Sequence, residues 1–100
     1  MPVTNSVGSD GKTVTIQISG RFDFNDHAGF REAYRETDGG SAYTLDMSQT
    51  EYMDSSALGM LLLLREHAGG DKANITVAGC KPEIKKILTI ANFQKLFTIK

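Results

Sequence analysis

The sequence predicts an α/β fold built on a largely parallel sheet. Residues 13–19 alternate apolar and polar side chains, which is typical of a strand with one buried face. Residues 56–68 are rich in leucine, lack β-branched side chains and exceed a typical strand in length, so they predict a helix. Strands and helices alternate after an opening hairpin, and the order β-β-α-β-α-β-α-β implies right-handed crossovers between parallel strands. The length of 100 residues predicts a single domain, residues 1–100.

The opening hairpin is predicted by the dipeptide Asp10-Gly11, a strong turn signal. It would join a weaker strand at residues 3–8 to the strand at residues 13–19. The buried face of the second strand is expected to consist of Val14, Ile16 and Ile18.

The first helix is expected to start at a cap formed by Asn25 or Asp26 and to run to about Thr37. The glycine-containing segment "DGGS" at residues 38–41 would end it. Helical spacing predicts a buried face made of Phe30, Ala33, Tyr34 and Thr37.

The second half of the chain continues the alternation of strands and helices. Residues 42–47 predict a strand that presents Tyr43, Leu45 and Met47 on one side, and the leucine-rich helix follows it. The remaining elements are expected to be a strand at residues 74–79, a helix at 81–92 with Pro82 in its first turn, and a strand at 95–99. The third helix would bury Ile84, Ile87, Leu88 and Ala91.

The composition is that of an ordinary globular protein, with 40% hydrophobic and 23% charged residues. A net charge of −1 gives no reason to expect a nucleic acid or an anionic membrane as a partner. Cys80 is the only cysteine, so no internal disulfide can form. The first residues lack the pattern of a signal peptide, and the longest apolar run, residues 60–64, is too short to span a membrane. These features predict a cytoplasmic protein.

The sequence offers little for catalysis. His27 and His67 lie on different predicted helices without metal-ligand spacing, and no glycine-rich phosphate loop is present. We therefore expect no metal, no cofactor and no enzyme activity. Three aspartates (Asp23, Asp46 and Asp54) could meet above the strand ends, but scattered acids of this kind are more often caps or solvated loop residues.

The segment "DSS" at residues 54–56 precedes the leucine-rich helix. Asp54, Ser55 and Ser56 are all good helix caps, whereas neither serine lies in a Gly-x-Ser-x-Gly nucleophile motif. Capping explains one of these three polar residues well and all three less well.

The leucine-rich helix has more apolar residues than one buried face requires. Its core stripe is expected to contain Ala57, Met60, Leu61, Leu64 and Ala68. Leu58, Leu62 and Leu63 fall outside that stripe, beside Gly59. They either pack against a neighbouring helix or form an exposed apolar surface, which is typical of a protein-binding site.

The segment "LDMSQTEYMDSSALGMLLL" at residues 45–63 resembles the signature of STAS domains, specifically of bacterial anti-sigma-factor antagonists. In that family a strand ending in Asp-x-Ser leads to Asp-Ser-Ser-Gly-Leu-Gly at the start of a helix. The segment "GRFDF" at residues 20–24 is similar to the family's Gly-x-hydrophobic-Asp segment. The order of elements extends the resemblance over the whole chain and implies the STAS fold, with helices packed mainly on one side of a mixed, largely parallel sheet.

The resemblance implies a phosphorylation switch. Unphosphorylated relatives bind an anti-sigma factor, often a serine kinase, and thereby release a sigma factor, and a PP2C-type phosphatase reverses the phosphorylation. On this sequence the phosphoacceptor would be Ser56. The partner-binding residues would be Asp23, Asp54, Ser55, Ser56, Ala57, Leu58, Gly59, Leu62 and Leu63.

One residue departs from the family pattern, because Ala57 stands where glycine is usual. Alanine is the better helix former, so the helix would begin more firmly. The resemblance also leaves a second function open, since some STAS domains serve as accessory domains that bind a small ligand or belong to a lipid-transport complex.

Overall fold

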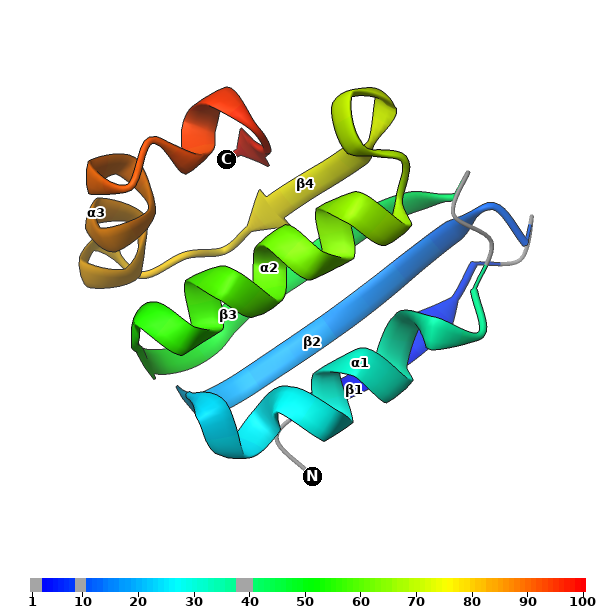
Figure 1. Ribbon diagram of the computed structural model, residues 1–100. Coiled ribbons are helices and arrows are strands. Elements are labelled where there is room, and N and C mark those ends of the chain that lie inside the picture. Colours follow the sequence, from blue (N-terminus) through cyan, green and yellow to red (C-terminus); the bar gives the residue numbers. More distant parts are fainter. Residues whose placement is uncertain (1–2, 9–10, 38–40) are drawn as a thin grey trace.

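The computed structural model describes residues 3–8, 11–37 and 41–100, in which five strands form one sheet (Figure 1). The strands lie side by side in chain order, β1 (Val3–Val7), β2 (Thr13–Phe22), β3 (Ala42–Met53), β4 (Asn74–Ala78) and β5 (Thr98–Ile99). β1 is antiparallel to β2, whereas every later pair of neighbours is parallel. The predicted α/β fold with a mixed, largely parallel sheet is therefore confirmed.

Three α-helices connect the parallel strands, α1 (His27–Arg35), α2 (Ser55–His67) and α3 (Pro82–Ile90). Short 3₁₀ helices accompany them, η1 (Phe24–Asp26), η2 (Gly70–Lys72) and η3 (Phe93–Lys95). Because the strand order advances in one direction, right-handed crossovers put the connecting helices on the same face of the sheet. Figure 1 shows α1 and α2 side by side across that face. The predicted element order β-β-α-β-α-β-α-β is confirmed.

The core lies between the sheet and the helices. β2 buries Val14, Ile16 and Ile18, as its alternation predicts, and α2 buries its predicted stripe of Ala57, Met60, Leu61, Leu64 and Ala68. The other face of the sheet is polar, since β2, β3 and β4 align Thr15, Thr44 and Thr76 there. One face of the sheet therefore packs the core, and the other is half exposed.

β3 is longer than predicted, because it continues from residue 47 to Met53. Its register with β2 shifts twice, between Gln17 and Ser19 and between Gly20 and Arg21 of β2. Each shift adds a residue on the β3 side, so the buried positions after Met47 are three residues apart, at Thr50 and Met53. A strict period of two cannot detect a strand with two such irregularities.

The first helix starts and ends differently from the prediction. η1 precedes α1 and is capped by Asp23, whereas Asp26 occupies the cap position of α1 without a side-chain bond to it. α1 ends at Arg35, so Thr37 lies outside it, and the Thr37 hydroxyl donates a hydrogen bond to the Tyr34 carbonyl. The proposed turn residue Asp10 and residues 38–40 of the stop signal lie outside the described residues.

The predicted last strand at residues 95–99 is mostly wrong, since only Thr98 and Ile99 pair with β4. Asn92 adopts a left-handed conformation with φ 63°, and η3 follows it. Phe93 and Phe97 then turn toward the core with their ring centroids 5.4 Å apart. This aromatic pair keeps residues 93–97 in a turn, which leaves two residues for β5.

The third helix is slightly shorter than the predicted range of residues 81–92. Pro82 stands at its first turn, as expected. Ile84 and Leu88 are buried, and Ile87 and Ala91 pack at the margin of the core.

Candidate functional site

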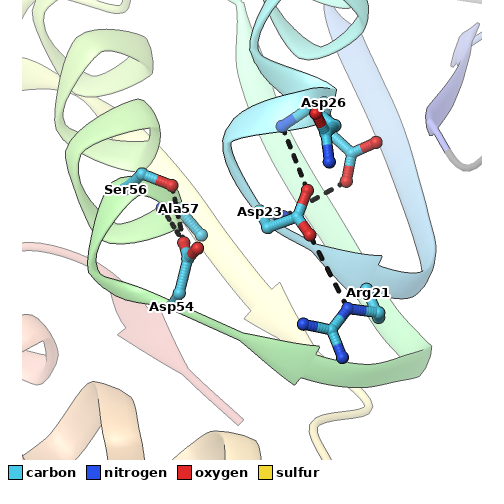
Figure 2. A network of polar contacts seen from close by, with 7 residues as sticks. Arg21, Asp23, Asp26, Asp54, Ser56 and Ala57 are labelled. Carbon is cyan, nitrogen blue, oxygen red and sulfur yellow. Dashed lines mark hydrogen bonds and ion pairs between the residues drawn. The ribbon is translucent and has the colours of Figure 1, made fainter.

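The ends of β2 and β3 lie next to each other at one edge of the sheet. Phe22 at the end of β2 pairs with Met53 at the end of β3, so Asp23 and Asp54 each follow directly on a paired residue. Figure 2 shows both aspartates at this edge, each at the start of a helical segment. The carboxyl edge of a parallel sheet is where α/β folds usually carry their sites.

Asp54 is the cap of α2. Its Oδ1 accepts a hydrogen bond from the Ala57 N–H at 3.0 Å and another from the Ser56 hydroxyl at 2.6 Å (Figure 2). These bonds, the one from Ser56 first, lower the pKa of the Asp54 carboxyl below its ordinary value of 3.8. The choice among three possible caps is therefore resolved in favour of Asp54.

The two serines differ in their surroundings. Ser55 is exposed, whereas Ser56 is half-buried and its Oγ is held against Asp54. The hydrogen bond from Ser56 to Asp54 fixes the direction of the Ser56 hydroxyl. The arrangement supports a positioned hydroxyl at a helix N-terminus, which is a favourable place for added negative charge.

Asp23 stabilises the neighbouring loop. Its Oδ1 accepts the Asn25 N–H at 3.0 Å, and its own N–H donates to Asp26 Oδ2 at 3.3 Å. Its Oδ2 also lies 3.6 Å from Arg21 Nε (Figure 2). The pairing of Phe22 with Met53 places Asp23 near the Asp54 segment, while its own contacts are with Arg21 at the end of β2 and with Asn25 and Asp26 of η1. The third aspartate, Asp46, is in the middle of β3 and accepts the Ser48 N–H at 3.0 Å, so it is not part of this edge.

The leucines outside the core stripe separate into two kinds. Leu58 is half-buried and packs against the core. Leu62 and Leu63 are 39% and 51% exposed, as one of the two alternatives expected. Gly59 is also exposed, whereas Ala57 is fully buried and contributes only its N–H to the edge.

Sequence reasoning missed three residues at the same edge. Phe24 is 69% exposed and Tyr52 is 43% exposed, and the guanidinium carbon of Arg21 lies 4.4 Å from the centre of the Tyr52 ring. The segment "RFDF" could have indicated the exposed phenylalanine. Phe22 is buried in the core, and Phe24, two residues later, is exposed. The Arg21–Tyr52 pair could not be found in this way, because it depends on the shifted register of β3.

The described residues meet the requirements of neither a metal site nor a membrane-spanning helix. The described residues include no group of three or more histidines, cysteines, aspartates or glutamates that could hold a metal ion. Within the same described ranges, no helix has both the length and the apolar character needed to cross a membrane.

Comparison with known proteins defines the class. The family model described as "Mlab, STAS domain" matches residues 5–98. The chain therefore belongs to the STAS domain family, and the resemblance seen in the sequence is confirmed. STAS domains with this fold are typically non-catalytic.

One sequence relative and two solved structures are similar to this chain. A "STAS-domain containing protein" of Pseudomonas aeruginosa (strain UCBPP-PA14) is 53% identical over 100 residues, which cover 99% of each chain. The unphosphorylated form of the anti-sigma factor antagonist SpoIIAA is 15% identical with a TM-score of 0.71, over 98% of this chain and 86% of that one. An anti-sigma factor antagonist from Mycobacterium paratuberculosis is 18% identical with a TM-score of 0.75, over 97% and 84%. At these identities the solved structures establish the fold and nothing further.

Proposed function

We propose that this chain is a non-enzymatic accessory domain of a lipid-transport complex and that it binds a subunit of the complex's ATP-binding-cassette transporter. The observation that carries the proposal is the match of residues 5–98 to the Mlab branch of the STAS family, which indicates a lipid-transport role. This function is the one that the sequence left open as its alternative. The expected partners are thus proteins of a transport complex rather than a sigma-factor pathway.

The binding surface that we propose extends from Asp54 along α2 to Leu63 and includes Asp23 in the adjoining loop. We call it the α2 docking surface, and its members are Asp23, Asp54, Ser55, Ser56, Leu58, Gly59, Leu62 and Leu63. Ala57, which the resemblance also implied, is fully buried and is not a member. Support comes from the exposure of Leu62 and Leu63, about two turns along α2 from the exposed Ser55 and the oriented hydroxyl of Ser56. Exposed apolar and polar groups on one helix are typical of protein interfaces.

The apolar part of this surface can supply useful affinity. Fully burying a leucine contributes about 1.5–3 kcal/mol, so two half-exposed leucines would contribute roughly 2 kcal/mol together. A difference of about 1.4 kcal/mol changes an equilibrium constant tenfold. Leu62 and Leu63 alone therefore suffice to change binding by more than a factor of ten.

Phosphorylation of Ser56 would act on the same surface. A phosphate adds about −1.5 to −2 charges, and the Ser56 Oγ is 2.6 Å from an Asp54 oxygen. The phosphoserine could not donate to Asp54, and the like charges of the phosphate and the Asp54 carboxylate would repel each other. The phosphate would have to turn outward from Asp54 toward a partner on the α2 docking surface.

The second candidate is a phosphorylation-switched anti-sigma-factor antagonist. It is favoured by the Asp54-Ser55-Ser56 segment at a helix start, where the resemblance implies a phosphoacceptor. Its partners would be an anti-sigma factor or serine-kinase anti-sigma protein and a PP2C-type phosphatase. Both candidates use the α2 docking surface, and they differ in the identity of the partner.

Affinity capture from the native cell separates the two candidates. Wild type and the Ser56→Ala variant would be used as bait, and the bound proteins identified by mass spectrometry. We expect a subunit of an ATP-binding-cassette transporter on both baits. Capture of an anti-sigma factor or serine kinase instead would reject the lipid-transport proposal and establish the second candidate.

A further inference from the structure

A groove of about 330 Å³ lies between α1 and α2, outside the α2 docking surface except for one shared residue, Leu63. Its lining residues are His27, Arg31, Tyr34, Arg35, Leu63 and His67. Pockets for small ligands measure about 300–1,000 Å³, so this groove has the size for a small ligand. Four of its residues come from α1 and two from α2, so the two histidines meet only through the packing of these helices and their spacing along the chain could not predict it.

The groove is basic although the chain has a net charge of −1. Its described lining contains two guanidinium groups and two imidazoles but no carboxylate. Arg35 is partly neutralised, because its nitrogens lie 3.4 Å from oxygens of both Glu32 and Glu36. Arg31 is exposed and forms no ion pair with the residues that the structure describes, so its charge is available to a ligand.

The rings of Tyr34 and His67 lie together in the groove. Their centroids are 5.0 Å apart, and His67 Nε2 is 3.0 Å from the Thr37 carbonyl oxygen, which fixes the imidazole. Burial raises the pKa of the Tyr34 phenol, while the nearby Arg31 charge opposes that increase. Tyr34 thus lines the groove near the Arg31 guanidinium, and its hydroxyl is a candidate hydrogen-bond donor there.

We propose that this groove binds the phosphate group of a small anionic ligand, with Arg31 as its principal contact. A guanidinium presents paired N–H donors that match phosphate oxygens, and the Tyr34 hydroxyl adds a donor. Leu63 offers an apolar wall for the carbon atoms attached to the phosphate. The same chemistry fits a phosphorylated metabolite and a phospholipid headgroup. This ligand site goes beyond the proposed partner binding and does not depend on it.

A titration with soluble phosphates tests whether the ligand is a phosphorylated metabolite. Inorganic phosphate and glycerol 3-phosphate would be added to the isotope-labelled full chain, and backbone and histidine resonances followed by NMR. In wild type we expect saturable chemical-shift changes for resonances of both α1 and α2. In Arg31→Gln we expect at least about tenfold weaker binding, because one bidentate charged contact is lost. Lys86→Gln on α3, another exposed residue, removes the same charge and should bind like wild type.

Sedimentation with vesicles tests whether the ligand is a phospholipid headgroup. Vesicles of phosphatidylcholine with and without phosphatidic acid would be mixed with wild type, Arg31→Gln and Lys86→Gln. Binding of wild type to phosphatidic acid alone, lost in Arg31→Gln, identifies a lipid headgroup, whereas binding of the soluble phosphates identifies a free ligand. The proposal is overturned if neither probe binds, or if Lys86→Gln weakens binding as much as Arg31→Gln does.

Discussion

Asp54 connects the start of α2 to the proposed function, because one carboxylate both caps the helix and holds the Ser56 hydroxyl. A cap that also touches the candidate phosphoacceptor must change its contacts when that residue is modified. The stability of the helix start and the state of Ser56 are therefore linked through this one side chain.

Replacement of Asp54 by alanine should destabilise the fold, since the Ala57 N–H would lose its side-chain acceptor and keep only the Asp54 backbone carbonyl, 3.1 Å away. Loss of a cap of ordinary strength lowers the melting temperature of a domain of this size by about 5 °C. Asp54→Asn keeps a side-chain oxygen in place and should lose much less. Thermal unfolding followed by circular dichroism measures both, and equal losses in the two variants would show that the cap bond contributes little.

The ionised form of Asp54 should also make stability depend on pH. Its folded pKa is lower than the ordinary value of 3.8, so its contribution is complete above that value and is lost as pH falls through the folded pKa. Compared with Asp54→Asn, wild type should lose unfolding free energy between about pH 5 and the lowest pH at which the fold persists. Urea unfolding across this range measures the difference, and parallel pH curves for the two proteins would contradict the lowered pKa.

At the scale of elements, two glycines test how α2 and the sheet are built. Gly59 lies in α2, is exposed and has open space where a Cβ would lie. Gly79 follows β4 with φ +76°, and a Cβ there would lie 3.0 Å from the Cβ of Ser48. Alanine should therefore stabilise the fold at position 59 and destabilise it at position 79.

Gly59→Ala should stabilise the protein by about 0.5–1 kcal/mol, because alanine is the better helix former. Gly79→Ala should destabilise it by more than about 1 kcal/mol, since the left-handed conformation and the contact with Ser48 both oppose a side chain. Chemical denaturation measures the pair in parallel. An equal effect of the two changes would mean that the close approach of residues 48 and 79 does not constrain the fold.

The elements also show what the sequence could predict. The alternation in β2 and the stripe of α2 predict their buried residues correctly, because each depends on a regular local period. The second half of β3 and the shortened β5 were missed, since two register shifts and the Phe93–Phe97 contact break that regularity. The basic groove was missed for a different reason, because Arg31 and His67 are brought together only by the packing of α1 against α2.

At the scale of the whole molecule, two surfaces of different chemistry lie on one layer of helices. The proposed α2 docking surface begins at the carboxyl edge of β2 and β3, whereas the basic groove lies between α1 and α2. Leu63 belongs to both, so a ligand in the groove would lie beside a bound partner. The half-buried Thr15, Thr44 and Thr76 lie on the opposite face of the sheet from the core that α2 packs against.

Phosphate on Ser56 should weaken partner binding without unfolding the chain, since a helix N-terminus tolerates negative charge. Ser56→Asp is expected to bind the captured partner at least about tenfold more weakly than Ser56→Ala, a difference of ~1.4 kcal/mol. Calorimetric titration of both variants measures this ratio. Equal affinity would remove Ser56 from the proposed interface.

The most direct test of the α2 docking surface is the affinity of the Leu62→Gln/Leu63→Gln double variant for the captured partner. The control is Ile90→Gln, which changes an apolar side chain that is 72% exposed on α3. We predict that the double variant binds more than about tenfold more weakly than wild type, as expected from burial of two half-exposed leucines, while the control binds unchanged. Wild-type affinity in the double variant would contradict the proposal that this helix carries the interface.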